Sequence, residues 1–271
     1  MSKPKLLYIS QEIAPYLSEN ELSTYSRDLP QSMQDHGYEV RTFMPKYGII
    51  NERRNQLHEV IRLSGMNIII DDSDHPLIIK VATLLPSRMQ VYFIDNDDYF
   101  QRHNVNDLET RLYTDDNDER IMFYVRGVIE TVKKLRWSAA IIQNTGWITA
   151  LAPMYLKKQY HDDPAFSDSK IVYALFNDKF EGTLDPRFVE KLRMCGFDDA
   201  DMKSIIDGPV DHIALNKLAI DHADAIAVAS EGIEPELIEY AQKSGKPFLA
   251  YPGKENCEQA FADFYASIQN K

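Results

Sequence analysis

Cysteine is scarce in this chain, since only Cys195 and Cys257 occur among its 271 residues. The two cysteines lie far apart in the sequence and form neither a CxxC motif nor a Cys/His pair at the spacing of metal ligands. We therefore expect two reduced thiols and no metal site.

Positive charge is also in short supply. The chain has 30 lysines and arginines against 42 aspartates and glutamates, which gives a net charge of −12. Nucleic-acid binding needs clustered positive charge, and so does attachment to an anionic membrane surface. The composition therefore argues against both as partners.

Long hydrophobic runs are missing. The opening "MSKPKLLYIS" goes from two lysines directly into an apolar run that is too short for the core of a signal peptide. No later run approaches the ~18 apolar residues of a spanning helix. We expect a soluble, cytoplasmic protein.

Glycine-rich loops are absent as well, because the chain has only 11 glycines and contains no G-x-S-x-G, P-loop or G-x-G-x-x-G motif. Hydrolases with a nucleophile elbow, P-loop NTPases and dinucleotide-binding enzymes depend on those loops. The sequence offers no candidate nucleophile, and we expect no cofactor.

What the chain does contain is an alternation of short β-rich apolar runs with segments of helical periodicity. One such helix is predicted by Ile121, Val125, Val128 and Val132. This alternation predicts an α/β fold, a Rossmann-like doubly wound and mainly parallel sheet, in a single domain spanning residues 1–271. The strands are expected at 6–10, 39–45, 90–95, 139–142, 170–175, 225–230 and 247–251.

Two segments depart from the simple alternation. Residues 58–85 hold two strand-like runs joined by "DDSD", which predicts a β-hairpin insertion that extends one sheet edge. Residues 247–271 predict a closing strand and a final helix from about Glu255 to Ile268. Short helices with a break near Gly196 are expected between 186 and 207.

The stretch "YISQEIAPYLSENELSTYSRDLPQSMQDHGYEVRTFMPKY" (8–47) resembles the opening of bacterial glycogen and starch synthases. The residues in register with that family are Glu12, Pro15, Leu22, Leu29, Pro30, Gly37, Val40, Pro45, Lys46 and Tyr47. The similarity continues at 93–102, 116–130, 147–157, 176–182 and 222–233. It implies the N-terminal half of a GT-B glycosyltransferase, without the second domain that supplies most contacts to the sugar nucleotide.

The departures from the family fall on its functional motifs, so the resemblance marks substrate-binding positions that are mostly substituted and implies no catalytic residue. Where the family has Lys-Thr-Gly-Gly, this chain has Ser18, Glu19, Asn20 and Glu21. The motif His-x-His-Asp-Trp-His-Thr is replaced by "QNTGWIT", and Ile-His-Asn by "LFN". The further substrate-binding positions are Gln143, Thr145, Gly146, Ile148, Phe176 and Asn177.

The first of these substitutions bears on ADP-glucose binding. Glycines let a backbone approach a diphosphate at a helix N-terminus, and a lysine adds positive charge there. A carboxylate about 4 Å from a phosphate oxygen would repel it by roughly 4 kcal/mol at an effective dielectric near 20. Glu19 and Glu21 can equally be favourable charges at the start of a helix near Ser18 or Asn20. Either interpretation argues against phosphate binding at this loop.

Ile148 replaces an imidazole and cannot exchange a proton. We expect it to pack on the same helix face as Leu151, Ala152 and Tyr155. Four aromatic residues could offer a flat face to a glucan, although core packing is the commoner role of such residues. They are Tyr16, Tyr47, Trp147 and Tyr155.

Two acidic runs and two Asp-His pairs could suggest chemistry, but simpler roles are expected. The runs at 95–98 and 115–119 lack the pattern of a calcium loop, and the second predicts a helix start capped by Thr114 or Asp115. His212 and His222 follow aspartates directly, and neighbours on a helix point apart. We expect both histidines to be partly exposed at the surface.

Three functional hypotheses remain open. The first is a catalytically degenerate relative of the glycogen and starch synthase N-terminal domain that acts as a binding or accessory protein in storage-glucan metabolism. The second is one half of a split ADP-glucose-dependent glucosyltransferase, which would need a partner chain for the nucleotide. The third is a small-ligand or protein-interaction module, with its site outside the strand ends near 11–21 and 143–148.

Overall fold

The computed structural model describes residues 3–101 and 115–269. Its strands are β1 (Lys5–Ser10), β2 (Glu39–Pro45), β3 (His58–Glu59), β4 (Met66–Ile70), β5 (Ser73–Leu84), β6 (Met89–Asp95), β7 (Ile141–Thr145), β8 (Lys170–Leu175), β9 (Ala225–Val228) and β10 (Phe248–Leu249). Its helices are α1 (Glu21–Asp35), α3 (Asn117–Leu135), α4 (Ala152–Lys158), α5 (Phe188–Met194), α6 (His212–His222), α7 (Pro235–Lys243) and α8 (Cys257–Gln269), with short 3-10 helices η1 (Trp147–Thr149) and η2 (Lys254–Asn256).

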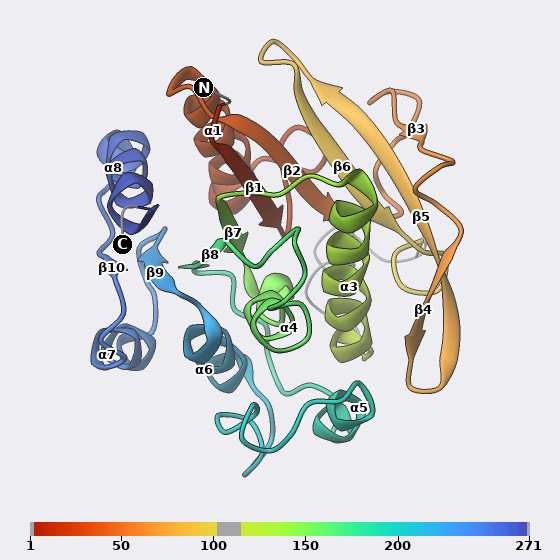
Figure 1. Ribbon diagram of the computed structural model, residues 1–271, viewed down its shortest axis with the longest axis vertical. Coiled ribbons are helices and arrows are strands. Elements are labelled where there is room, and N and C mark those ends of the chain that lie inside the picture. The colour runs from red at the N-terminus through yellow and green to blue at the C-terminus, as the bar shows by residue number, and fades with distance from the viewer. Residues whose placement is uncertain (1–2, 102–114, 270–271) are drawn as a thin grey trace.

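One sheet runs through the molecule in the order β10-β9-β8-β7-β1-β2-β6-β5-β3 (Figure 1). Neighbouring strands from β10 to β6 pair in parallel, whereas β5 runs antiparallel to β6 and β3 antiparallel to β5. This confirms the predicted mainly parallel, doubly wound sheet. The order reverses at β1, where a sheet of this kind opens a crevice at its carboxyl edge.

The predicted hairpin insertion is present at one edge of the sheet. Strands β4 and β5 pair antiparallel and are joined by Asp71 and Asp72, both with positive φ. Aspartate tolerates this left-handed backbone better than most residues, which suits a two-residue hairpin turn. Strand β5 also pairs with β6, so the hairpin extends this edge of the sheet, as the sequence predicted.

Helices cover both faces of the sheet. In Figure 1, α3, α4 and α6 stand in front of the strands and α1 lies behind them. Helix α3 approaches β5 and β6 so closely that a Cβ on Gly127 would lie 2.9 Å from Ile94. Its N-cap is Asp116, which makes no side-chain capping bond, so the prediction of Asp115 was wrong and Thr114 lies outside the described residues.

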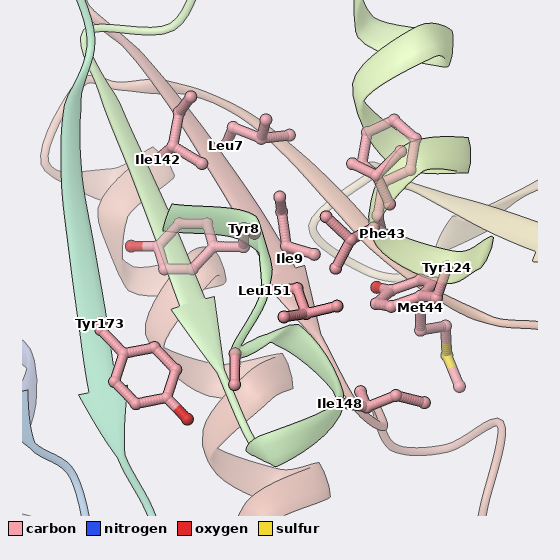
Figure 2. Close-up of a cluster of buried hydrophobic side chains, with 14 of the residues drawn as sticks. Leu7, Tyr8, Ile9, Phe43, Met44, Tyr124, Ile142, Ile148, Leu151 and Tyr173 are labelled. Atoms are coloured by element: carbon pink, nitrogen blue, oxygen red, sulfur yellow. The ribbon is translucent and has the colours of Figure 1, made fainter. Parts of the chain in front are cut away.

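The core gathers side chains from the central strands and from the helices in front of them. Figure 2 shows Ile148 and Leu151 in one cluster of buried hydrophobic side chains, with Leu151 near Ile9. Ile148 is fully buried, as predicted, but it lies in η1 rather than on a continuous helix with the residues of α4. The four aromatic residues considered for glucan stacking are all buried in the core, so they present no face to a ligand: Tyr16, Tyr47, Trp147 and Tyr155.

Several element boundaries differ from the prediction. Strand β9 ends at Val228 and β10 has only two residues, both shorter than expected. Before α8 the chain forms η2, because Gly253 at φ 79° starts a separate turn there. Among residues 3–101 and 115–269, no helix is both long and apolar enough to cross a membrane.

Candidate functional site

The predicted site residues meet at the carboxyl edge of the sheet, where the chain leaves β1, β7, β8 and β9. The backbone N–H of Gln11 donates to the carbonyl of Thr145 at 3.1 Å, which joins the ends of β1 and β7. On the other side of β7, the N–H of Asn177 donates to the Ser230 hydroxyl at 2.8 Å. These contacts bring the loop after β1 beside the segments that follow β7 and β8, which hold the predicted site residues.

The turn after β7 depends on Gly146. Its φ is 88°, a left-handed conformation that side chains rarely adopt. A Cβ at this position would lie 2.8 Å from the Gln11 Cβ and 3.0 Å from the Asp178 carboxylate. The space beyond Gly146 is therefore filled by side chains from the ends of β1 and β8.

Those two side chains also occupy the backbone donors that start η1. The N–H of Trp147 donates to Asp178 Oδ2 at 2.7 Å, and the N–H of Ile148 donates to Gln11 Oε1 at 3.4 Å. Free N–H groups at a helix start are what an anionic ligand would use. At this turn the chain's own side chains take that role, and one of them brings a negative charge.

His212 lies next to this carboxylate and was placed wrongly by the sequence. Its side chain is only 2% exposed, its Nε2 is 3.7 Å from Asp178 Oδ1, and the Phe180 ring covers it at 5.6 Å. Its neighbour Asp211 caps α6 by accepting from the N–H of Ala214. The expectation of a surface histidine failed because the covering residues come from another part of the chain.

Gln143 takes the place of the first histidine of the family motif and is held in a buried network. Its Nε2 donates to the Tyr25 hydroxyl at 2.9 Å, and its Oε1 accepts a hydrogen bond from Tyr265 of α8. The Tyr265 hydroxyl is also 3.1 Å from that of Tyr8. Both polar groups of the Gln143 side chain are therefore satisfied inside the protein.

The first loop leads into α1 through Asn20. Its side chain accepts from the N–H of Ser23 at 2.8 Å, and the Ser23 hydroxyl accepts from the N–H of Asn20 at 3.0 Å. The Asn20 amide also donates to Glu12 at 3.1 Å. The reciprocal pair is a capping box, which fixes the start of the helix and occupies the N–H of Ser23.

The charged residues of this loop face solvent. Glu19 pairs with Arg27 at 2.9 Å, and Glu21 begins the first turn of α1, with its carboxylate 3.6 Å from Lys254. Only Glu21 is therefore a first-turn charge of the kind predicted, since Glu19 precedes the cap. The Ser18 carbonyl accepts from the Ser23 hydroxyl at 3.2 Å.

The remaining predicted positions, Phe176 and Asn177, differ in their exposure to solvent. Phe176 is buried, with its ring 5.5 Å from that of Tyr25. Asn177 is exposed and sits against Gly232, where an added Cβ would lie 2.7 Å from its amide nitrogen. Of this pair only Asn177 is accessible at the strand edge.

A pocket of about 450 Å³ opens beside the first loop, between α1 and the segment that leads into α8. Its acidic lining consists of Glu19, Glu21, Asp28 and Glu258, against one lysine, Lys254. Its lining also includes Tyr25, Leu29, Ala229, Tyr251 and Cys257. Burial raises the pKa of the Cys257 thiol to about 11. The electrostatics of this pocket oppose a phosphate group.

The acidic run at 115–119 serves the fold. Lys191 of α5 donates to Asp118 at 2.7 Å and to Glu119 at 2.6 Å, both on the first turn of α3. These carboxylates hold α5 against α3. No group of three or more His, Cys, Asp or Glu side chains is arranged to bind a metal in the described part of the chain.

A family model described as the starch synthase catalytic domain matches residues 5–247. The chain belongs to this family. The glycogen synthase of Chlorobium limicola is 32% identical over 241 residues, which are 86% of this chain and 47% of that protein. The glycogen synthase of Chlorobaculum tepidum is 30% identical over 267 residues, 98% of this chain and 52% of that protein. The chain thus spans about half the length of these relatives.

The fold agrees with this membership. The catalytic domain of starch synthase IV from Arabidopsis thaliana, bound to ADP and acarbose, superposes with a TM-score of 0.72 and 17% identity. The superposition covers 92% of this chain and 51% of that structure. This likeness supports the predicted GT-B type architecture.

Sequence reasoning missed three residues whose side chains occupy the candidate site. Gln11 directly precedes the quoted Glu12, Asp178 follows the "LFN" segment, and Tyr265 lies in the final helix. The one signal that could have pointed to Asp178 is its position at the carboxyl end of a predicted strand.

Proposed function

We propose that this starch synthase domain is catalytically degenerate and acts as a cytoplasmic binding or accessory protein in storage-glucan metabolism. The observation that carries the proposal is the acidic pocket at the first loop, where four carboxylates stand against Lys254 in the lining and Arg27, which pairs with two of them. A donor such as ADP-glucose brings a diphosphate, which the potential of this pocket would repel.

The turn after β7 supports the same proposal. Transfer of a glucosyl group calls for groups that orient the sugar and stabilise the charge that develops on the leaving diphosphate. Here Ile148 is apolar, and the first N–H groups of η1 are bonded to Asp178 and Gln11. Gln143, in the middle of β7, is bonded to tyrosines on α1 and α8.

The test of degeneracy is a glucosyl-transfer assay with ADP-glucose and glycogen, run beside the Chlorobium limicola glycogen synthase. We expect no incorporation by this chain and no increase of its melting temperature with ADP. Cooperative thermal unfolding of the same sample shows that the protein is folded. Clear turnover by the purified chain would overturn the proposal.

The binding role has its own test. Native electrophoresis through gels with and without glycogen measures glucan binding without any turnover. We expect migration to be retarded in the glycogen gel relative to a protein of similar charge and size. Equal mobility in both gels would exclude the glucan-binding role while leaving the absence of transfer intact.

A second candidate is half of a split glucosyltransferase, and the observation that favours it is the coverage of only 47% and 52% of the two glycogen synthases. Such an enzyme would need a separate chain with a nucleotide-binding domain, encoded near this one. Co-expression and co-purification of the two chains, followed by the same transfer assay, separates the candidates. Transfer by the complex would favour the split enzyme, and an inactive complex would favour the accessory role.

A further inference from the structure

The lining of the pocket between α1 and α8 combines carboxylates with apolar and aromatic side chains. The tyrosines Tyr25 and Tyr251 belong to this lining, together with Leu29 and Ala229. Helices α1 and α8 contact one another, and Figure 1 shows α8 standing beside α1 at the edge of the molecule. A volume of about 450 Å³ is within the range that holds small ligands or anchoring side chains.

The carboxylates of the pocket differ in how far they are neutralised. Glu19 and Asp28 share Arg27, at 2.9 and 2.6 Å. Within the described part of the chain, the one ion pair of Glu21 is with the highly exposed Lys254, at 3.6 Å. Glu258 makes no ion pair or hydrogen bond with any of the described residues. Two carboxylates therefore remain available to a cation that enters from outside.

An arginine side chain matches this mixed lining. Its methylene groups can pack on the apolar and aromatic side chains while its guanidinium binds carboxylates with two parallel hydrogen bonds. The tyrosine rings add a favourable surface for a guanidinium plane. Phosphate and carboxylate ligands meet the opposite situation, since they would face like charges.

We propose that the pocket between α1 and α8 is the docking site for an arginine side chain in a basic segment of a partner protein. Charge complementarity supports a basic partner, because the chain as a whole carries −12 and would attract such a surface over a distance of about a Debye length. This inference does not depend on the glucan role, since a partner could dock here whether or not the chain binds glucan.

The test uses three probes on isotope-labelled protein, with amide chemical shifts as the readout. The first is acetyl-Gly-Arg-Gly-amide, and the second has citrulline, an uncharged isostere, in place of the arginine. The third, n-propylguanidine, carries the side chain alone. We expect the arginine peptide to shift amides in 19–28 and 251–258 and to bind at least as tightly as n-propylguanidine.

The citrulline peptide should cause no such shifts. Equal binding of the arginine and citrulline peptides would overturn the proposal, as would the absence of shifts in these segments. Binding of n-propylguanidine without the arginine peptide would show a small-molecule pocket instead and would also overturn it.

Paired variants tie the binding to the pocket. Glu21→Gln with Glu258→Gln should weaken the arginine peptide about tenfold. The control pair, Glu236→Gln with Glu239→Gln on α7, changes the net charge equally and should leave the affinity unchanged. Equal weakening by both pairs would mean attraction to overall charge and would contradict a specific pocket.

The affinity for the arginine peptide should rise when Lys254, which competes for Glu21, is removed. Lys254→Gln frees Glu21 and should strengthen binding of the arginine peptide, whereas Lys243→Gln, which removes a lysine paired with Glu239 at 2.5 Å on α7, should not. No gain from Lys254→Gln, or the same gain from both variants, would count against the proposal.

Discussion

The Tyr265 hydroxyl donates a hydrogen bond to the side-chain oxygen of Gln143, which joins the final helix to the central strand β7. Tyr265 belongs to α8, which lies beyond residues 5–247 that match the family model, and Gln143 stands where the resemblance places the first histidine of a motif. The helix thus covers the Gln143 side chain in the middle of β7, two residues before the strand ends. A buried amide that is fully bonded stabilises the fold and leaves no group there for a sugar.

Substitution Tyr265→Phe should lower the free energy of unfolding by about 1–3 kcal/mol. It keeps the ring but leaves the buried oxygen of Gln143 without a donor and removes the contact with the Tyr8 hydroxyl. Urea denaturation monitored by circular dichroism measures the change. The control is Tyr240→Phe, whose hydroxyl bonds Asp221 at the surface. Equal stability of Tyr265→Phe and the control would contradict the covering role of α8.

The backbone at Gly146 gives a second prediction. Gly146→Ala should destabilise more than Gly37→Ala, although φ is positive at both positions, 88° and 92°. Both variants place a side chain at positive φ, and at Gly146 a ψ of 152° adds a backbone region that only glycine adopts readily. Only Gly146→Ala adds overpacking, of about 1–3 kcal/mol, against Gln11 and Asp178. Thermal and urea unfolding of the two variants measure the difference. Equal losses of unfolding free energy would show that the turn after β7 is loosely packed and would contradict the prediction.

A pH dependence is expected from His222. Burial lowers its pKa below the ordinary 6.5, while its Nε2 lies 2.7 Å from the Asp201 carbonyl oxygen. Below about pH 6.5 the unfolded chain therefore binds a proton that the folded chain resists, so this group lowers the free energy of unfolding as the pH falls. His222→Gln keeps a donor and should lose less stability than the wild type between about pH 7.5 and 5.5. Equal losses of unfolding free energy by His222→Gln and the wild type over this pH range would contradict the prediction.

The thiol of Cys257 should react slowly. Its pKa is raised to about 11 by burial, and the thiolate is the nucleophilic form. At about pH 8, alkylation by iodoacetamide should be roughly a hundredfold slower than that of a free cysteine peptide, as followed by mass spectrometry. Alkylation at the rate of the peptide would show an open thiol and would argue against the packing of α8 at the pocket.

Much of the fold could be predicted because it is encoded by local patterns. Short β-rich runs such as "KIVYAL" became β8, and the apolar spacing from Ile121 to Val132 became the buried face of α3. The "DDSD" turn placed the hairpin, because aspartates favour the backbone that the turn adopts. The carboxyl ends of the predicted strands then indicated where the substrate-binding positions of the family would lie close together.

The interior of the candidate site could not be predicted in the same way. Tyr265 meets Gln143 across 122 residues, and no periodicity encodes that pairing. Asp178 bonds Trp147 across 31 residues, and its carboxylate lies near the buried His212. The split of the expected helix into η1 and α4 follows from the geometry of Gly146, which depends on Gln11 across the neighbouring strand.

The most direct measurement is the titration of ADP-glucose into the folded protein by calorimetry at about 0.15 M salt, where screening limits repulsion by the net charge of −12. The acidic pocket and the occupied N–H groups of η1 predict no saturable binding with a dissociation constant below about 1 mM. Saturable binding of one ADP-glucose per chain in the micromolar range, with the diphosphate found on residues 18–22 in soaked crystals, would contradict the account.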